Sequence, residues 1–296
     1  MVAAMKLEMD CLPCFLSQTL NTVRRFGGGR EAEERALRAV LEQLARADFD
    51  LSPPRLAPAV YGAIYRVLGT HDPYAEIKRD STRHALALLP GLRRRVEAAA
   101  DPFAVAARIS LAGNIVDFGT NHPFDLEATL DRVLGAPLAV DHTDLLRRRL
   151  ETAREVLFLA DNAGEIVLDR LLLEQMPSGP RVVVAVRGGP IINDATLEDA
   201  RAAGLDQLAR LVEPGVTLPG IDLERSSPEL RRLYQQADVI IAKGQGNFET
   251  LESGPVFHLF MVKCEMVARL TGQALGAPLV ASRELFARRR PGQAGG

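Results

Sequence analysis

Segments with polar residues and glycines follow three apolar runs of the sequence, and the residue types suit metal and phosphate chemistry. These residues are Asp161 and Asn162 after the run 156–160, Arg187, Gly188 and Asp194 after the run 182–186, and Lys243, Gly244, Asn247 and Glu249 after the run 239–242. If the runs are parallel strands, their carboxyl ends meet at one edge of a sheet, where ligands bind in open α/β folds. We therefore expect these side chains to share one site.

Asp161, Asn162 and Asp194 are the expected metal ligands. Carboxylate and amide oxygens, without histidine or thiol, suit one hard divalent cation, Mg²⁺ or Mn²⁺, for which Co²⁺ or Ni²⁺ can substitute. Taken singly, an Asp-Asn pair after a strand or an aspartate before a helix is equally typical of a turn or a helix cap. Their recurrence at successive strand ends favours the metal site.

Arg187 and Lys243 are the cations expected to hold a phosphate group. Backbone N–H groups of Gly188 and Gly244, and the first turns of the helices that follow Asn162 and Asp194, would add to that attraction. The glycines match neither the G-x-x-x-x-G-K-[ST] phosphate loop nor the G-x-G-x-x-G fingerprint. By themselves they are therefore a weak signal.

Two further groups of residues each allow two interpretations. Asn114 and Asp117 are polar residues in an apolar helical segment, where they either cap a break or face a cleft. Cys11, Cys14 and Cys264 are either packing residues or a thiol cluster that binds zinc or does redox chemistry.

Residues 1–150 are expected to form a helical domain without strands. Apolar residues recur at helical spacing over 11–26, 31–47, 55–68 and 75–89. Pro90 and Gly91 are expected to end the fourth helix before another covers 92–100. Pro102 then begins the next one.

Residues 151–286 are expected to form an α/β domain. The runs 156–160, 182–186 and 239–242, with a fourth at 278–281, are short and apolar throughout, and helical stretches at 166–175 and 196–203 separate some of them. This pattern is typical of a doubly wound, mainly parallel sheet with helices on both faces. Residues 287–296 are expected to be a flexible tail.

Length, charge and cysteine content argue against several classes of protein. A chain of 296 residues favours two domains, and a net charge of −2 argues against a dedicated nucleic-acid binder. No apolar run is long enough for a membrane span, and the N-terminus does not have the pattern of a signal peptide. Three cysteines argue against a disulfide framework. These features indicate a cytoplasmic protein with no membrane partner, and they indicate no oligomeric state.

Together the motifs resemble one family, the damage-control phosphatases once catalogued as domain of unknown function 89, in its cysteine-bearing prokaryotic branch. The segments that carry the resemblance are CxxC at 11–14, GNxxDFG at 113–119, DNAGE at 161–165, RGxPxxND at 187–194 and KGxGNxET at 243–250. The resemblance implies a helical domain packed on an α/β/α domain, with a site between them. It also implies metal ligands at Asp161, Asn162 and Asp194, a phosphate-binding lysine at Lys243, and Asn114 and Asp117 in the cleft.

The activity that this resemblance implies is metal-dependent hydrolysis of phosphate monoesters of small metabolites, such as sugar phosphates or damaged cofactor intermediates. The metal would act as a Lewis acid. The nucleophile is either metal-bound water, with Asp194 or Glu165 as general base, or the carboxylate of Asp161. Two other functions stay open: methyl transfer from S-adenosylmethionine, and a non-catalytic module that binds a metabolite.

Overall fold

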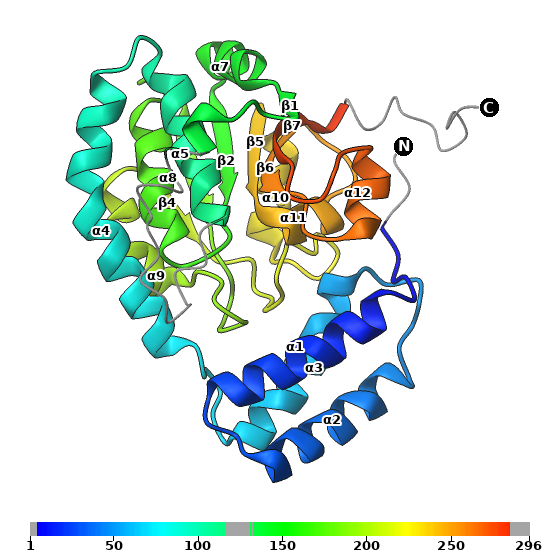
Figure 1. Cartoon of the computed structure of the whole chain (residues 1–296). Helices are drawn as coiled ribbons and strands as arrows, with labels where there is room; N and C mark the ends of the chain where they lie inside the picture. Colours follow the sequence, from blue (N-terminus) through cyan, green and yellow to red (C-terminus); the bar gives the residue numbers. More distant parts are fainter. Residues whose placement is uncertain (1–4, 116–130, 132, 285–296) are drawn as a thin grey trace.

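The computed structural model describes residues 5–115, 131 and 133–284, which contain one seven-stranded sheet (Figure 1). The strand order is β1-β7-β6-β5-β2-β3-β4, and every neighbouring pair is parallel except β6 and β7. The strands are Val140–Asp141 (β1), Glu155–Leu159 (β2), Arg181–Ala185 (β3), Arg210–Val212 (β4), Val239–Lys243 (β5), Val256–Met261 (β6) and Pro278–Ser282 (β7). The four predicted strands are thus confirmed as β2, β3, β5 and β7.

Side chains of the central strands alternate between two covered faces of the sheet. Phe158 and Ile241 pack in the hydrophobic cluster that includes helices α4 (Ala75–Glu97), α5 (Pro102–Ile115), α7 (Thr143–Thr152) and α8 (Glu165–Glu174). Leu157 and Ile240 pack on the opposite face with Leu230 of α10 (Pro228–Gln236). Apolar residues on both sides of each strand are what a doubly covered parallel sheet requires. The predicted α/β fold, doubly wound and mainly parallel with a helical N-terminal part, is confirmed.

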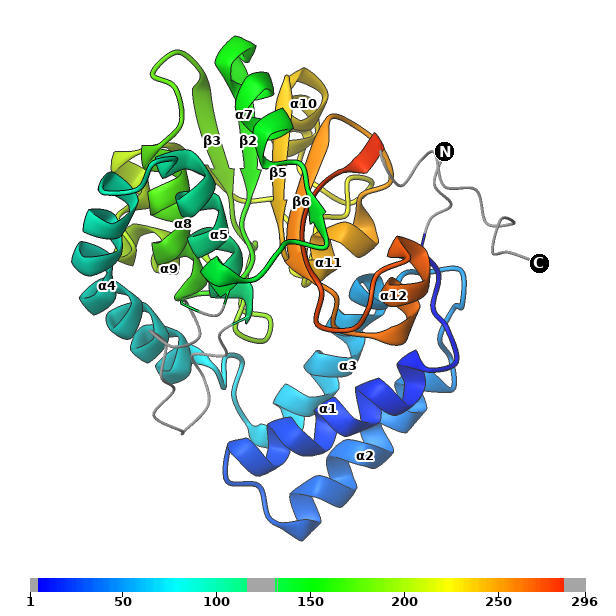
Figure 2. The same cartoon turned by 45° about the horizontal axis from the view of Figure 1, so that its top comes forward.

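The first three helices form a separate layer beyond the carboxyl ends of the strands (Figures 1 and 2). They are α1 (Cys11–Arg25), α2 (Arg30–Leu44) and α3 (Pro53–Leu68), and their hydrophobic cluster extends to β6, β7 and α12 (Glu265–Thr271). An ion pair between Arg55 Nη2 and Asp222 Oδ1, at 2.9 Å, joins α3 to the loop after β4. This layer therefore faces the strand ends, where the candidate site was predicted.

The predicted division into domains at residue 150 stays a prediction. Helices α4, α5 and α7 precede this position, yet they share one hydrophobic cluster with the sheet that follows it. The predicted tail, residues 287–296, lies outside the described part of the chain. No helix within that part has both the length and the apolar character needed to cross a membrane.

Two local predictions in the first half are wrong. Pro90 lies inside one continuous helix, α4, rather than ending it. A proline removes one backbone hydrogen bond, but Leu89, Leu92 and Val96 on either side of it are buried in the sheet cluster, and their packing favours a continuous helix. The first half also contains the short strand β1, which pairs with β7.

Several elements of the second half were not predicted. These are the strands β4 and β6, the helix α10, the 3-10 helix η1 (Leu205–Gln207) and the short helix α11 (Gly244–Thr250). The predicted helices at 166–175 and 196–203 are confirmed as α8 and α9 (Leu197–Ala202).

Candidate active site

Backbone hydrogen bonds join the loops that follow β2 and β3. The N–H of Ala195 donates to the carbonyl of Asp161 at 2.7 Å, and the N–H of Ala163 donates to the carbonyl of Asn193 at 2.9 Å. Asn162 and Asp194 form an isolated antiparallel bridge between them. The three predicted metal ligands therefore lie together at the strand ends.

Arg187 connects the two aspartates of this group. Its Nη2 donates to Asp161 Oδ1 at 2.9 Å and its Nε donates to Asp194 Oδ2 at 2.5 Å. The guanidinium is fully buried, and Nη1 also contacts Asn247 Oδ1 at 3.4 Å. Arg187 therefore fixes the two carboxylates relative to each other.

Lys243 ends β5 and forms a second buried ion-pair group. Its Nζ lies 2.7 Å from Glu165 Oε1 and 2.5 Å from Asp169 Oδ1, and all three side chains are fully buried. Glu165 and Asp169 are four residues apart on α8, so their side chains lie on the same face of this helix. A third contact, to the carbonyl of Ser110 at 3.0 Å, ties Lys243 to α5.

The two groups contain more negative charge than positive charge. Four buried carboxyl groups, Asp161, Asp194, Glu165 and Asp169, share only two buried cations, Arg187 and Lys243. Burial, followed by the charges of Asp194 and Glu165, raises the pKa of Asp161 to about 7. Burial likewise raises the pKa of Asp169 to about 6 and that of Asp194 above its usual value. Burial opposes ionisation of Glu165 too, but Lys243 and the hydrogen bonds to it lower its pKa.

Two asparagines connect these carboxylates to an open space. Asn114 Nδ2 donates to Asp161 Oδ2 at 3.0 Å and to Glu165 Oε2 at 3.1 Å, and Asn162 Nδ2 donates to the same two atoms at 2.9 Å each. Asn114 Oδ1 is buried and has no hydrogen-bond partner among the residues that the structure describes. Because a buried amide oxygen normally has a partner, this atom is a vacant acceptor at the edge of the acidic group.

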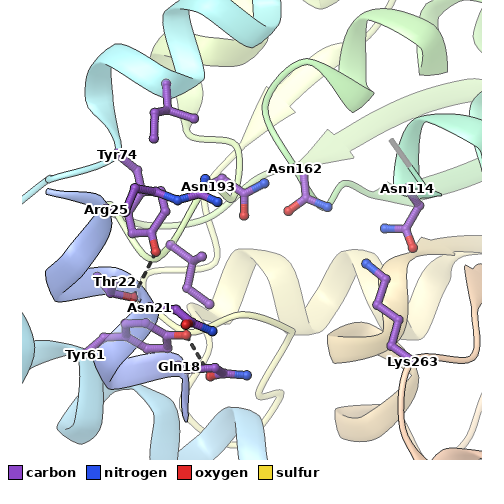
Figure 3. Close-up of a pocket in the computed structure, with 12 residues that line it drawn as sticks. Gln18, Asn21, Thr22, Arg25, Tyr61, Tyr74, Asn114, Asn162, Asn193 and Lys263 are labelled. Carbon is purple, nitrogen blue, oxygen red and sulfur yellow. Dashed lines mark hydrogen bonds between the residues drawn. The ribbon is translucent and has the colours of Figure 1, made fainter. Parts of the chain in front are cut away.

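A cavity of about 420 Å³ lies between the first helical layer and the strand ends (Figure 3). Its lining is mostly amide, hydroxyl and cationic side chains, with two isoleucines: Gln18, Asn21, Thr22, Arg25, Tyr61, Tyr74, Ile77, Asn114, Asn162, Ile192, Asn193 and Lys263. In Figure 3, Asn162, Asn114 and Lys263 lie on one side and the residues of α1 on the other. The cavity is thus closed by segments that are far apart in the sequence.

Of the predicted site residues, Asn114 and Asn162 line the cavity. Arg187 and Lys243 do not line it, because their polar atoms are buried against carboxylates. The arrangement therefore lends no support to their prediction as phosphate ligands. Asp117 lies outside the described residues.

The remaining predicted residues have mainly structural contacts. The Gly188 N–H donates to the carbonyl of Val216 at 3.1 Å, and the Asn247 amide donates to the carbonyls of Lys243 at 2.7 Å and Ala160 at 3.2 Å. Glu249 is buried beside Gln245, and burial raises its pKa to about 7.

The three cysteines are free thiols, and both interpretations of them, as packing residues or as a thiol cluster, stay open. Burial, with smaller effects of Cys264 and Glu249, raises the pKa values of both Cys11 and Cys14, that of Cys11 to about 11. Within the described ranges, no three His, Cys, Asp or Glu side chains are arranged to hold a metal ion. The candidate metal site at the strand ends thus has two carboxylates and amide oxygens as its donors.

Four cationic and aromatic residues of the cavity were not predicted from the sequence, namely Arg25, Tyr61, Tyr74 and Lys263. Arg25 and the tyrosines belong to helices, where nothing in the sequence distinguishes a residue that faces a cavity from one in the core. Lys263 lies just after β6 and Val262, and the mainly apolar run VFHLFM before it resembles the three runs that were recognised. That signal could have identified it.

Ile192 in the cavity wall has an unusual backbone conformation. Its φ of 48° is rare for a β-branched residue. Its N–H donates to the Tyr65 hydroxyl at 2.9 Å, which holds the loop after β3 against α3. Strained backbone of this kind concentrates at functional sites.

Comparison with known proteins identifies relatives along nearly the full chain. Residues 7–279 match the model of the damage-control phosphatase ARMT1-like domain. A damage-control phosphatase of Pyrococcus horikoshii is 33% identical over 95% of this chain and 99% of its own length, and one of Archaeoglobus fulgidus is 32% identical over 92% and 97%. The crystal structure of a DUF89 family protein of Pyrococcus horikoshii superposes with a TM-score of 0.88 at 32% identity, over 94% of this chain and 99% of that one.

Gly244→Ala is expected to displace Asp161 and destabilise the protein. Gly244 has a φ of 77°, and an added Cβ would lie 2.0 Å from Asp161 Oδ2. The backbone strain alone costs about 1–3 kcal/mol, so the free energy of unfolding in denaturant should fall by at least that amount. Gly179→Ala is the control, because no neighbouring atom lies within 4 Å of its added Cβ. Equal stability of the two variants would contradict the close packing of Asp161 on Gly244.

Lys243→Met is expected to lower stability as well as any activity. It leaves Glu165 and Asp169 buried without their cation, and breaking a buried ion pair costs about 3–5 kcal/mol. Denaturant unfolding measures this loss against Lys6→Met, which removes an exposed lysine that pairs with Asp50. A variant as stable as the wild type would show that Lys243 is not a structural cation.

Proposed function

The chain belongs to the ARMT1-like damage-control phosphatase family, and from this membership we propose that it is a divalent-metal-dependent phosphatase. Its substrates would be phosphate monoesters of small metabolites. The family supports a phosphatase of metabolite repair. The metal and the substrate class are our inferences from the site.

The charge imbalance at the strand ends is the observation that carries the metal proposal. Four buried carboxyl groups share two cations, so the group has the capacity to bind one more divalent cation. The donors are all oxygens, which suits Mg²⁺ or Mn²⁺. Asp161, Asn162 and Asp194 would hold the ion, with the unpartnered Asn114 Oδ1 beside them. When bound, it would supply Lewis-acid stabilisation of charge on the phosphoryl group.

The contacts of the carboxylates favour water over Asp161 as the nucleophile. Asp161 Oδ1 accepts from Arg187, and Oδ2 accepts from Asn114 and Asn162. An oxygen held by these donors is less nucleophilic and is fixed in place. A water molecule in the adjoining cavity has no such restriction.

The choice of general base is supported in the same way. Glu165 is fully buried, with Oε1 bound by Lys243 and Oε2 bound by two asparagine amides. Arg187 contacts Asp194 at Oδ2. These contacts favour Asp194 over Glu165 as the acceptor of the proton of the attacking water.

The cavity lining supports a small, polar substrate. Amide and hydroxyl side chains of α1 and the loop after β3, such as Gln18, Asn21 and Asn193, can hydrogen-bond hydroxyl or amide groups. A volume of about 420 Å³ is in the range of small-molecule sites. Sugar phosphates and phosphorylated cofactor intermediates have this chemistry.

The two other functions considered from the sequence have less support. No observation favours an S-adenosylmethionine site, and the relatives named phosphatases span almost the whole chain. A non-catalytic module would not need the buried acidic group beside the cavity. Ligand binding without turnover would revive that hypothesis.

Hydrolysis of p-nitrophenyl phosphate by chelator-treated protein is expected only after Mg²⁺, Mn²⁺, Co²⁺ or Ni²⁺ is added. In Asp161→Asn, turnover should stay at background with every metal, because the variant removes a ligand charge. The unfolding midpoint of Asp161→Asn should not fall. The substitution removes a buried negative charge that Asp194 and Glu165 repel. The matched control is Asp206→Asn, an exposed aspartate of η1, which should keep full activity. Full turnover by metal-free protein, or by Asp161→Asn, would reject the proposal.

A further inference from the structure

The turn that leads to Asp194 has a backbone conformation that its own sequence does not favour. The N–H of Asp194 donates to the carbonyl of Ile191 at 3.1 Å, so the turn runs from Ile191 to Asp194 with Ile192 in second position. A positive φ at this position is usually supplied by glycine, asparagine or aspartate. Over residues 5–115, 131 and 133–284, Ile192 is the only non-glycine residue with a positive φ. Contacts from outside the turn are therefore needed to hold it.

Those contacts come from the first helical layer. The Tyr65 hydroxyl of α3 accepts the N–H of Ile192 at 2.9 Å, and Ile191 is buried in the hydrophobic cluster that includes Tyr65. Burial raises the pKa of Tyr65, so the hydroxyl stays neutral and keeps this acceptor role at any working pH. Helix α3 is itself tied to the α/β part by the ion pair of Arg55 with Asp222. The turn is thus held against a fixed helix.

The other side of the turn adjoins the proposed metal ligands. The carbonyl of Asn193 accepts the N–H of Ala163 at 2.9 Å, and Asp194 forms the isolated bridge with Asn162. Asn193 also lines the cavity, as Asn162 does (Figure 3). A change of φ at Ile192 would rotate the chain immediately before Asn193 and Asp194. The turn therefore connects α3 to the metal site.

We propose that Tyr65 is a positioning residue of the metal site, whose hydroxyl holds the turn 191–194 in the conformation that presents Asp194 to the cation. This inference rests on the proposed metal-dependent function. Tyr65 acts through the backbone of Ile192 and is not itself a metal ligand. The first helical layer thus contributes to metal affinity in addition to forming a wall of the cavity.

Tyr65→Phe tests the proposal, because it removes the hydroxyl and keeps the ring. Without the hydroxyl, the turn relaxes in the metal-free protein, and metal binding has to restore it. Backbone strain at one residue is equivalent to about 5- to 150-fold in an equilibrium constant, and since the packing of Ile191 remains, we expect the Kd for Mn²⁺ to rise by about 5- to 30-fold. Electron paramagnetic resonance of the free ion measures this Kd. Hydrolysis of p-nitrophenyl phosphate by Tyr65→Phe should recover at saturating Mn²⁺, which a loss of folded protein would not allow.

Tyr234→Phe is the matched control. Tyr65 and Tyr234 are each 8% exposed, and the Tyr234 hydroxyl also bonds to the main chain, by donating to the carbonyl of Ser253. Tyr234 belongs to α10, on the sheet face opposite α8. Tyr234→Phe should therefore lose a comparable hydrogen bond and keep the wild-type Kd for Mn²⁺.

Ile192→Gly tests whether the hydroxyl acts through the turn. Glycine adopts a positive φ without strain, so in the Ile192→Gly background Tyr65→Phe should change the Kd by less than about 2-fold. An equal loss of affinity in the two backgrounds would overturn the assignment, because the hydroxyl would then act by another route.

The same titrations separate this inference from the proposed function. Wild type and Tyr65→Phe that bind Mn²⁺ with equal Kd overturn the role of Tyr65, while the metal proposal stands. A folded wild type that binds no Mn²⁺ overturns both.

Discussion

The buried ion pairs of Arg187 and Lys243 are the constraint on which the site depends. A charged side chain without water requires a partner, and each of these cations connects carboxylates from different elements. Arg187, after β3, holds the loop after β2, while Lys243, at the end of β5, holds α8 and α5. The strand ends and the helix that carries Asn114 are thereby fixed together. Because the carboxylates outnumber the cations, the same interaction leaves a negative site at the cavity edge.

The sequence predicted the sheet and helices where the local pattern and the tertiary contacts agree. Strands such as β2 and β5 are apolar on both faces, and this pattern alone identifies a doubly covered parallel sheet. Pro90 was misjudged because packing of Leu89 and Leu92 on the sheet outweighs one missing hydrogen bond. The strand β1 has only two residues and is stabilised by pairing with β7, far along the chain, so no local pattern could reveal it.

The candidate site was predictable in its acidic part and not in its cationic part. Asp161, Asn162 and Asp194 lie in the loops after two neighbouring parallel strands, and this topology brings them together. The same rule placed Arg187 and Lys243 at the sheet edge, but it does not specify whether a side chain points into the cavity or into the core. Residues such as Arg25 depend on how α1 packs across the strand ends, which is a tertiary property.

Binding of Mn²⁺ to chelator-treated protein, followed by electron paramagnetic resonance of the free ion, tests the central claim most directly. The surplus of buried carboxylates predicts one bound Mn²⁺ per chain, displaced by Mg²⁺. Folded protein that leaves all added Mn²⁺ free in solution would contradict the account, because the negative charge left over by Arg187 and Lys243 would then be neutralised by protons and not by a metal ion.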